Sequence, residues 1–225
     1  MAELETDEET FHTLKIVNNQ VGGGKRPHPE RESHMKTINA SDWPLVILVD
    51  EHDNCLGTGE KLKVHRGTGQ LHRAFSTFVI DDQDRVLLQR RATSKYHCPG
   101  LWANTCCSHP QPGKSLLECA KQRLQVEFGF STSLHKIGTV QYNLPLDNDF
   151  TEREFDHIFL GCYNGPVAPN PYEIDDFKWV HSSVLAQDLI DNAERYVPWL
   201  PKIFPIFFQH PRMQAVFQDH KQQNP

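Results

Sequence analysis

A cysteine and a histidine stand two residues apart in Cys107-Ser108-His109, and two glutamates have the same spacing in Glu152-Arg153-Glu154. In an extended segment alternate side chains point to one face, so each pair would present its two functional groups together. Each pair alone has an ordinary explanation, because most Glu-x-Glu pairs are solvated and most Cys-x-His pairs are incidental. Adjacent carboxylates nevertheless repel each other unless a cation or a proton lies between them.

Two further histidines, His65 and His72, precede the first strongly β-prone segment of this region. Together with His109, Glu152 and Glu154 they would give three imidazoles and two carboxylates. That mixture of nitrogen and oxygen ligands suits a divalent ion such as Mn²⁺, Zn²⁺ or Fe²⁺. The sequence predicts a metal site if these five side chains converge, which their spacing alone does not show.

Five basic residues are candidates for a phosphate-binding group: Lys61, Arg90, Arg91, Lys95 and Arg123. Guanidinium groups make bidentate contacts with phosphate oxygens, so such a group could hold a diphosphate. The alternative is scattered surface charge.

The elements that must position these groups can be read from local patterns. Ser115 and Glu118 form a capping box that predicts a helix start, and Gly129 is placed to end that helix. Strands are predicted at 45–50, 74–81, 85–91, 137–143, 154–162 and 176–180, and further helices at 182–190 and 199–222. The segments 74–81 and 85–91 are typical of a hairpin, and 92–113 is rich in turn residues. The order predicts an α+β fold or a mixed sandwich.

Composition limits the class of protein. The 225 residues carry a net charge of −6, which argues against a nucleic-acid partner. No apolar run reaches the length of a membrane span. The six cysteines include the neighbours Cys106 and Cys107, which are awkward for a disulfide scaffold, so we expect reduced thiols and a cytoplasmic location.

The polar residues 1–43 are predicted to be a mobile N-terminal segment, and residues 44–225 a single domain. Ser33-His34-Met35 resembles a cloning junction, which makes Met35 an alternative start to Met1.

Four stretches in order, LHRAFSTFVI, LLQRRATSK, CPGLWANTCCSHP and ERE, resemble type I isopentenyl-diphosphate isomerases. The resemblance covers about residues 45–210. It implies a Nudix-like α/β/α sandwich with a mixed sheet, an extra N-terminal strand region and C-terminal helices. It also implies interconversion of isopentenyl and dimethylallyl diphosphate through a carbocation, in isoprenoid precursor biosynthesis, with a small-molecule diphosphate as partner and a monomer favoured over an obligate oligomer.

The resemblance also implies roles for single residues. The catalytic groups would be Cys107 (rather than Cys106), Glu154 and Tyr142. One divalent ion, Mn²⁺, Mg²⁺ or Zn²⁺, would lie on His65, His72, His109, Glu152 and Glu154. A Mg²⁺ would arrive with the substrate and be bound by Glu127, while the diphosphate would contact Lys61, Arg91, Lys95 and Arg123, and Trp199 would face the reacting carbons.

Two questions stay open at this point. Glu154 with Tyr142 is the preferred source of the proton and Cys107 handles the other proton, but the roles could be reversed. The Nudix signature is broken, since Ser108, Gln122-Arg123 and Val126-Glu127 stand where hydrolases carry glycine and most of their acidic residues. A Nudix-type diphosphate hydrolase and a metal-stabilised binding protein without activity are the alternatives.

Overall fold

The computed structural model describes residues 44–213. Its helices are α1 (Lys61–Val64), α2 (Leu116–Phe128), α3 (Ser182–Asp191), the 3₁₀ turn η2 (Ala193–Arg195) and α4 (Leu200–Phe208). Its strands are β1 (Leu45–Val49), β2 (Cys55–Glu60), β3 (His72–Ile80), β4 (Arg85–Arg91), β5 (Trp102–Ala103), β6 (Cys106–Ser108), β7 (Leu134–Pro145), β8 (Thr151–Cys162) and β9 (Ile174–His181).

The nine strands form one mixed sheet within the described residues. Strand β3 runs parallel to β8 over its whole length, while the other pairings are antiparallel. The expected hairpin of β3 and β4 is confirmed only at its turn, where Ile80 pairs with Val86. Beyond that pair the ladder between β3 and β4 does not continue, whereas β4 pairs with β9 along its whole length.

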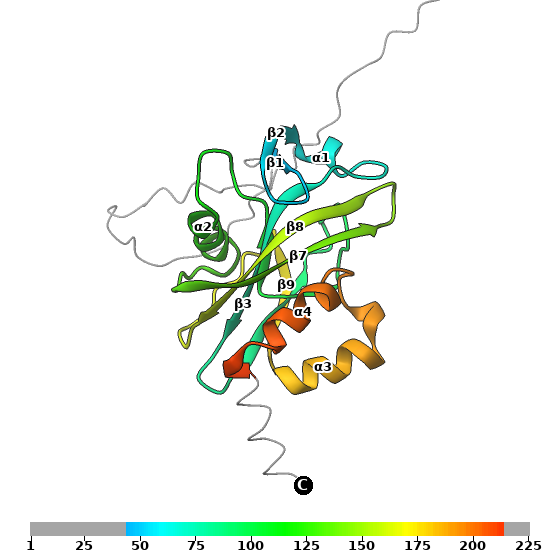
Figure 1. Cartoon of the computed structure of the whole chain (residues 1–225). Coiled ribbons are helices and arrows are strands. Elements are labelled where there is room, and N and C mark those ends of the chain that lie inside the picture. Colours follow the sequence, from blue (N-terminus) through cyan, green and yellow to red (C-terminus); the bar gives the residue numbers. More distant parts are fainter. Residues whose placement is uncertain (1–43, 214–225) are drawn as a thin grey trace, which may run out of the picture. The chain divides into compact units, whose positions relative to one another are not determined.

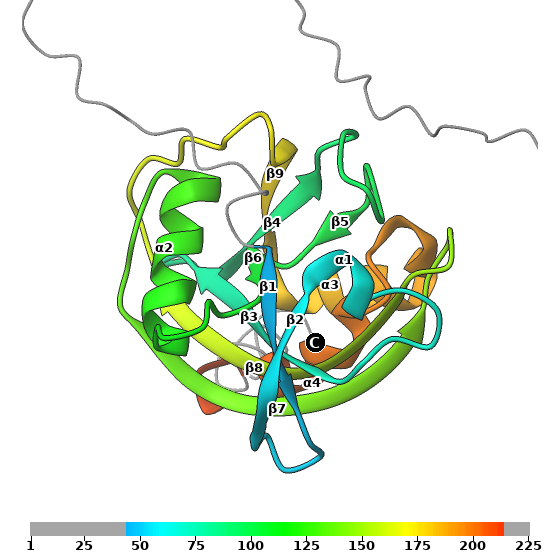
Figure 2. The same cartoon turned by 90° about the horizontal axis from the view of Figure 1, so that it is seen from above.

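Helices cover both faces of the sheet, with α2 on one side and α3 and α4 on the other (Figures 1 and 2). Alternation along β3 explains this arrangement, because Phe75 and Val79 pack with α2 whereas Phe78 and Ile80 pack with α3 and α4. The α/β/α sandwich expected from the sequence is therefore confirmed.

Helix α2 has the predicted ends. The Glu118 amide donates to the Ser115 hydroxyl at 3.2 Å, and the Ser115 amide donates to the Glu118 carboxylate at 3.0 Å. Gly129 ends the helix with a φ of 73°, a left-handed conformation that glycine adopts without strain.

Some elements were not foreseen or were misjudged. Strand β2 has mostly exposed residues and contains Gly57 and Gly59, so it lacks an apolar signal, and β5 and β6 are too short to have one. The prediction of one continuous helix over 199–222 is wrong near His210, because α4 ends at Phe208. Pro211 disfavours helical geometry at the residue before it, which is His210. Residues 1–43 and 214–225 lie outside the described part, so the mobile segment and the domain limits stay predictions.

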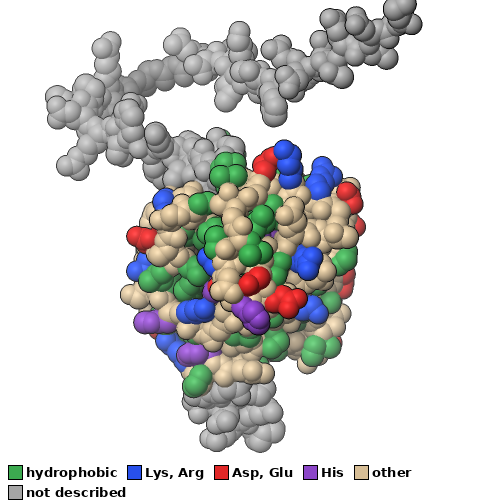
Figure 3. Space-filling view, turned by 45° about the horizontal axis from the view of Figure 1, so that its top comes forward, with side chains coloured by type: hydrophobic (Ala, Val, Ile, Leu, Met, Phe, Trp, Pro, Cys, Tyr) green, Lys and Arg blue, Asp and Glu red, His purple; other side chains and the backbone are tan. Residues whose placement is uncertain are grey.

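No helix within residues 44–213 is long and apolar enough to cross a membrane. Acidic and basic side chains are interspersed on the face drawn in Figure 3.

Candidate active site and metal centre

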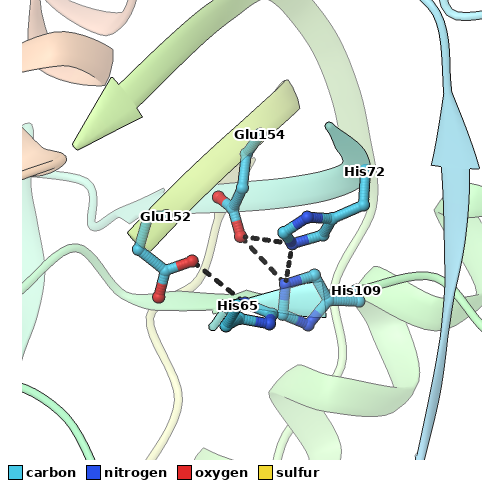
Figure 4. Close-up of side chains that lie close together, drawn as sticks. All are labelled: His65, His72, His109, Glu152 and Glu154. Atoms are coloured by element: carbon cyan, nitrogen blue, oxygen red, sulfur yellow. Dashed lines mark hydrogen bonds and ion pairs between the residues drawn. The ribbon is translucent and has the colours of Figure 1, made fainter. Parts of the chain in front are cut away.

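Five side chains from four separate segments converge at one end of the sheet (Figure 4). His72 begins β3 and is the direct partner of Glu154 in the parallel β3–β8 ladder. Glu152 lies two residues earlier on the same face of β8, His109 directly follows β6, and His65 ends α1. The candidate ligand atoms all lie within 4.8 Å of one another, and all five residues are buried.

The hydrogen bonds of two rings show which nitrogen atoms are available. His65 Nδ1 lies 2.6 Å from the Lys61 carbonyl and His72 Nδ1 lies 2.8 Å from the Gln70 carbonyl. A carbonyl oxygen can only accept, so each Nδ1 carries a proton and each Nε2 is left to face the cluster. Each Nε2 offers a lone pair that can bind a metal ion when the ring is neutral, and is a donor to a carboxylate when the ring is protonated. The two Nε2 atoms point into the cluster, the arrangement that backbone contacts impose on metal-binding histidines.

A positive charge at the centre of the cluster would stabilise the nitrogen and oxygen atoms that face it. His72 Nε2 and His109 Nε2 lie 3.1 Å apart, and His65 Nε2 lies 3.1 Å from Glu152 Oε2 although neither atom has a hydrogen-bond partner. Burial lowers the pKa of His109 to about 3, so this imidazole is neutral. Facing lone pairs and buried carboxylates of this kind fit a divalent cation, and the donor set fits a borderline metal. The protein therefore has a buried His/Glu cluster that could hold a divalent metal ion.

The carboxylates of the cluster are ionised. Burial and the adjacent Glu152 oppose ionisation of Glu154, but its hydrogen bonds with His109 and His72 outweigh them and hold its pKa at about 2. Burial likewise opposes ionisation of Glu152, yet contacts with His65 and His97 keep its pKa well below the ordinary value. A cation between the two carboxylates acts in the same direction.

The neighbouring cysteines face opposite ways, as residues in a strand must. Cys106 is fully buried beneath α2, whereas Cys107 packs on the opposite face with the α4 side of the core. Cys107 pairs in β6 with Ser76 of β3. Burial raises the pKa of the Cys107 thiol to about 12, although Arg91 opposes this shift, so the group holds its proton at neutral pH.

A chain of polar groups connects this region to the metal cluster. The Tyr142 hydroxyl donates to Glu154 and lies 3.2 Å from Asp156 Oδ2. The Ser76 hydroxyl donates to the same Asp156 oxygen at 2.7 Å. Burial, followed by the charge of Glu154, raises the pKa of Asp156 well above its ordinary value, and burial also raises that of Tyr142.

Beside α2, two cations share buried carboxylates. Arg123 donates through Nε to Glu127 at 2.6 Å, and its NH2 lies 2.8 Å from Glu173 Oε2. Lys95 forms an ion pair with the same Glu173 oxygen. Burial lowers the pKa of Lys95 to about 8, helped by nearby Arg91, Arg123 and Lys61.

Arg91 and Arg90 point to opposite faces of β4. Arg91 is buried, and its guanidinium lies 5.4 Å from the centre of the Trp199 ring. Arg90 points to the other face and lies 3.8 Å from exposed Asp176, so the structure does not bring it to the site. Lys61 lies 5.7 Å from the Tyr96 ring, and burial lowers its pKa.

Four residues at the site were absent from the sequence-based predictions: Gln89, His97, Asp156 and Glu173. Asp156 continues the alternation of Glu152 and Glu154 along β8, a signal that was present in the sequence. Gln89 donates to Glu127 at 2.7 Å, but the turn-rich segment 92–113 separates β4 from α2 in the sequence, and nothing local marks Gln89. His97 and Glu173 come from loops, where no periodic pattern exists.

The fold has relatives of known structure. A crystal structure of a Deinococcus radiodurans protein aligns with a TM-score of 0.60 at 16% identity, covering 72% of this chain and 97% of that one. At this identity the likeness concerns the fold. The NUDIX domain family matches residues 70–202, more than half of the chain. The chain thus belongs to the NUDIX domain family, and its buried His/Glu cluster could hold a divalent metal ion.

Relatives with higher sequence identity show to which family of NUDIX proteins the chain belongs. Isopentenyl-diphosphate Delta-isomerase 1 of Aromatoleum aromaticum is 48% identical over 156 residues, 69% of this chain and 87% of that protein. An isopentenyl-diphosphate Delta-isomerase of Serratia proteamaculans is 43% identical over 155 residues, again 69% of this chain and 86% of the relative. The chain belongs to the isopentenyl-diphosphate Delta-isomerase family, as the sequence motifs predicted.

Proposed function

We infer that this protein is an isopentenyl-diphosphate Delta-isomerase that interconverts isopentenyl and dimethylallyl diphosphate. The observation that carries the inference is one connected set of groups: the Tyr142 hydroxyl donates to Glu154 of the His/Glu cluster, and Cys107 pairs with Ser76, whose hydroxyl donates to an Asp156 oxygen 3.2 Å from Tyr142. Lys95 and Arg123 lie beside α2, where they share Glu173. Shifting an unactivated double bond requires one proton to be added and another removed, without water nearby. Buried groups of opposite protonation state on one face suit that task.

The diphosphate would be held by Lys61, Arg91, Lys95 and Arg123. Of these, Lys95 and Arg123 share Glu173, so a diphosphate entering the site would compete with this carboxylate for the same cations. Glu127 would bind Mg²⁺ together with the substrate, which is the way proteins usually hold this ion. Fixing the diphosphate at this end keeps a good leaving group away from the cation that forms at the alkene.

The groups proposed to move protons have complementary resting states. Cys107 and Tyr142 carry protons, whereas Glu154 is an ionised acceptor. Proton transfer is most effective when the pKa of a group lies near the operating pH, and a thiol with a pKa of about 12 is a weak acid while a carboxylate with a pKa of about 2 is a weak base. Glu154 with Tyr142 as donor and the reverse assignment with Cys107 as donor are therefore both carried forward, and because the reaction is reversible each group donates in one direction and accepts in the other. A divalent ion on the His/Glu cluster would hold Glu154 in place and stabilise its charge.

Trp199 is proposed to face the carbocation. Its ring is buried at the start of α4, beside Arg91 and 5.9 Å from the ring of His97. An aromatic face stabilises a cation by about 0.5 to 1 kcal/mol at an exposed site and by about 2 kcal/mol or more when the cation is desolvated. Its packing in the apolar core fixes the plane of the ring.

Incubation with isopentenyl diphosphate in D₂O, with Mg²⁺ and Mn²⁺ present, tests the proposal. We expect dimethylallyl diphosphate to form and deuterium to enter both product and recovered substrate. Absence of isomerised product would overturn the proposed function. Release of inorganic phosphate instead would favour the hydrolase alternative, which α2 argues against because Glu127 is the one carboxylate in its last two turns.

Single variants assign the roles. Cys107→Ala and Glu154→Gln should each abolish turnover, and Cys106→Ala should remain active. If Cys107 is the donor, Glu154→Gln with its metal content verified still exchanges deuterium into isopentenyl diphosphate, whereas Cys107→Ala does not. The opposite pattern would support the assignment preferred from the sequence. An inactive Cys106→Ala with an active Cys107→Ala would contradict both.

The identity of the ion in the His/Glu cluster, Mn²⁺, Mg²⁺ or Zn²⁺, is open to metal analysis of the purified protein. A monomeric state and a cytoplasmic location remain predictions from the sequence.

A further inference from the structure

One histidine lies between the metal cluster and the diphosphate-binding cations without belonging to either set. The side chain of His97 comes from the loop between β4 and β5, and its Nε2 lies 2.9 Å from Glu152 Oε1. The other oxygen of Glu152, Oε2, faces His65 Nε2 at 3.1 Å. Glu152 is therefore held from two sides, with one oxygen directed into the cluster and the other directed at His97.

The contact has a definite donor. A carboxylate oxygen only accepts, so His97 donates through Nε2 to Glu152. His97 Nδ1 is buried and has no hydrogen-bond partner among the described residues. The ring is thus oriented by Glu152 and by packing, with its centre 4.3 Å from the Tyr96 ring and 5.9 Å from the Trp199 ring.

The same loop also fixes Arg91. The Arg91 NH2 group donates to the His97 carbonyl at 3.1 Å and lies 3.3 Å from His97 Nε2, while Arg91 Nε donates to the Cys98 carbonyl at 3.2 Å. Cys98 has a φ of 48°, and this turn of the backbone brings both carbonyls to one guanidinium. The ring of His97 is therefore bonded to Glu152 and its backbone carbonyl to Arg91, so this one residue links the two side chains.

We propose that His97 is a positioning residue that holds metal ligand Glu152 in its binding orientation and couples it to Arg91 of the diphosphate site. The proposal rests on the proposed function for the roles of Glu152 and Arg91. A residue that hydrogen-bonds to a metal-ligating side chain, and so fixes its orientation, typically raises metal affinity about 10- to 100-fold. The link would also make diphosphate binding depend on metal loading, because a coupling between two binding sites acts equally in both directions.

The test uses His97→Ala and His97→Gln, with His135→Ala as the matched control. His135 is an exposed histidine of β7. Mn²⁺ is titrated into each metal-free protein by calorimetry, and inorganic pyrophosphate is titrated into each protein with and without Mn²⁺. Neither measurement needs turnover, so an isomerase assay that fails would not affect the outcome. Circular dichroism establishes that each variant is folded, and His97→Gln, which keeps an N–H donor, is the reference if His97→Ala does not fold.

We expect His97→Ala to bind Mn²⁺ about 10- to 100-fold more weakly, with a shifted visible spectrum when Co²⁺ replaces Mn²⁺. His97→Gln should recover most of the affinity, and His135→Ala should match the unaltered protein. The gain in pyrophosphate affinity caused by Mn²⁺ should shrink several-fold in His97→Ala. Unchanged Mn²⁺ affinity in both His97 variants would overturn the proposal. If His97→Ala binds Mn²⁺ more weakly but Mn²⁺ still raises its pyrophosphate affinity as much as in the unaltered protein, the coupling to Arg91 would be overturned.

Discussion

Raising the pH should remove one positive charge from the diphosphate site at an unusually low value. Burial lowers the pKa of Lys95 to about 8, and the nearby Arg91, Arg123 and Lys61 act in the same direction, against Glu127. Lys95 also pairs with Glu173, which leaves its ammonium aimed at the place where Arg123 binds. If Lys95 binds the diphosphate as proposed, it does so in its protonated form, so the charge that the substrate needs is present below about pH 8 and lost above it.

The magnitude follows from the same pKa. With a value of about 8, roughly nine tenths of Lys95 is protonated at pH 7 and roughly one tenth at pH 9. The specificity constant kcat/KM should therefore fall about 16-fold between pH 8 and pH 9.5, approaching a tenfold loss for each further unit. Each unit corresponds to about 1.4 kcal/mol. This decrease at high pH forms the alkaline limb of the pH profile. Ionisation of the substrate does not contribute to the limb, because a terminal phosphate with a second pKa near 6 is already ionised.

The assay is kcat/KM for isopentenyl diphosphate from pH 6.5 to 10 in the unaltered protein and in Lys95→Arg. Arginine stays charged throughout this range, so the variant should show no limb near pH 8. Lys202→Arg, at an exposed lysine of α4, is the matched control and should keep the limb. A limb that persists in Lys95→Arg and disappears in Lys61→Arg would assign it to Lys61 and refute the reasoning about Lys95.

Three further outcomes are expected. Glu173→Gln should lower the free energy of unfolding by about 3 kcal/mol in urea, because Lys95 and Arg123 lose the buried carboxylate they share; an unchanged midpoint would contradict this. Removal of divalent ions by a chelator should abolish turnover and lower Tm, since the ligand atoms of the His/Glu cluster then repel each other, and added Mn²⁺ should restore both; equal Tm values with and without metal would speak against a bound ion. Leu124→Ala, in the fully buried face of α2, should cost about 2 to 5 kcal/mol in thermal or urea unfolding, and a loss below 1 kcal/mol would mean that the α2 face is less tightly packed than described.

Local geometry explains what could be predicted. The capping box at Ser115 and the end at Gly129 depend on a few neighbouring residues, so both ends of α2 followed from the sequence. The common face of Glu152 and Glu154 follows from the period of a strand. The opposite directions of Cys106 and Cys107 follow from the same period, and the family resemblance supplied the choice between them.

The hairpin of β3 and β4 shows the limit of this local information. Its turn was correctly placed, yet the partner of β4 along most of its length is β9, nearly a hundred residues away. That pairing depends on which strands bury the most apolar surface together, a property of the whole sheet. Arg90 and Arg91 point to opposite faces of β4 because side chains alternate along a strand, but only the packed sheet decides that Arg91 faces the site and Arg90 contacts Asp176 of β9.

The opening pairs, Glu152 with Glu154 in β8 and Cys107 of β6 with His109 directly after it, could be recognised in the sequence because extended backbone has a period of two residues. Their convergence with His65 and His72 was decided by the tertiary structure, through the parallel register that sets His72 opposite Glu154. His97 and Glu173 belong wholly to that second category. Both lie in loops, and a loop side chain acquires a role only when the fold brings a buried partner within hydrogen-bonding distance.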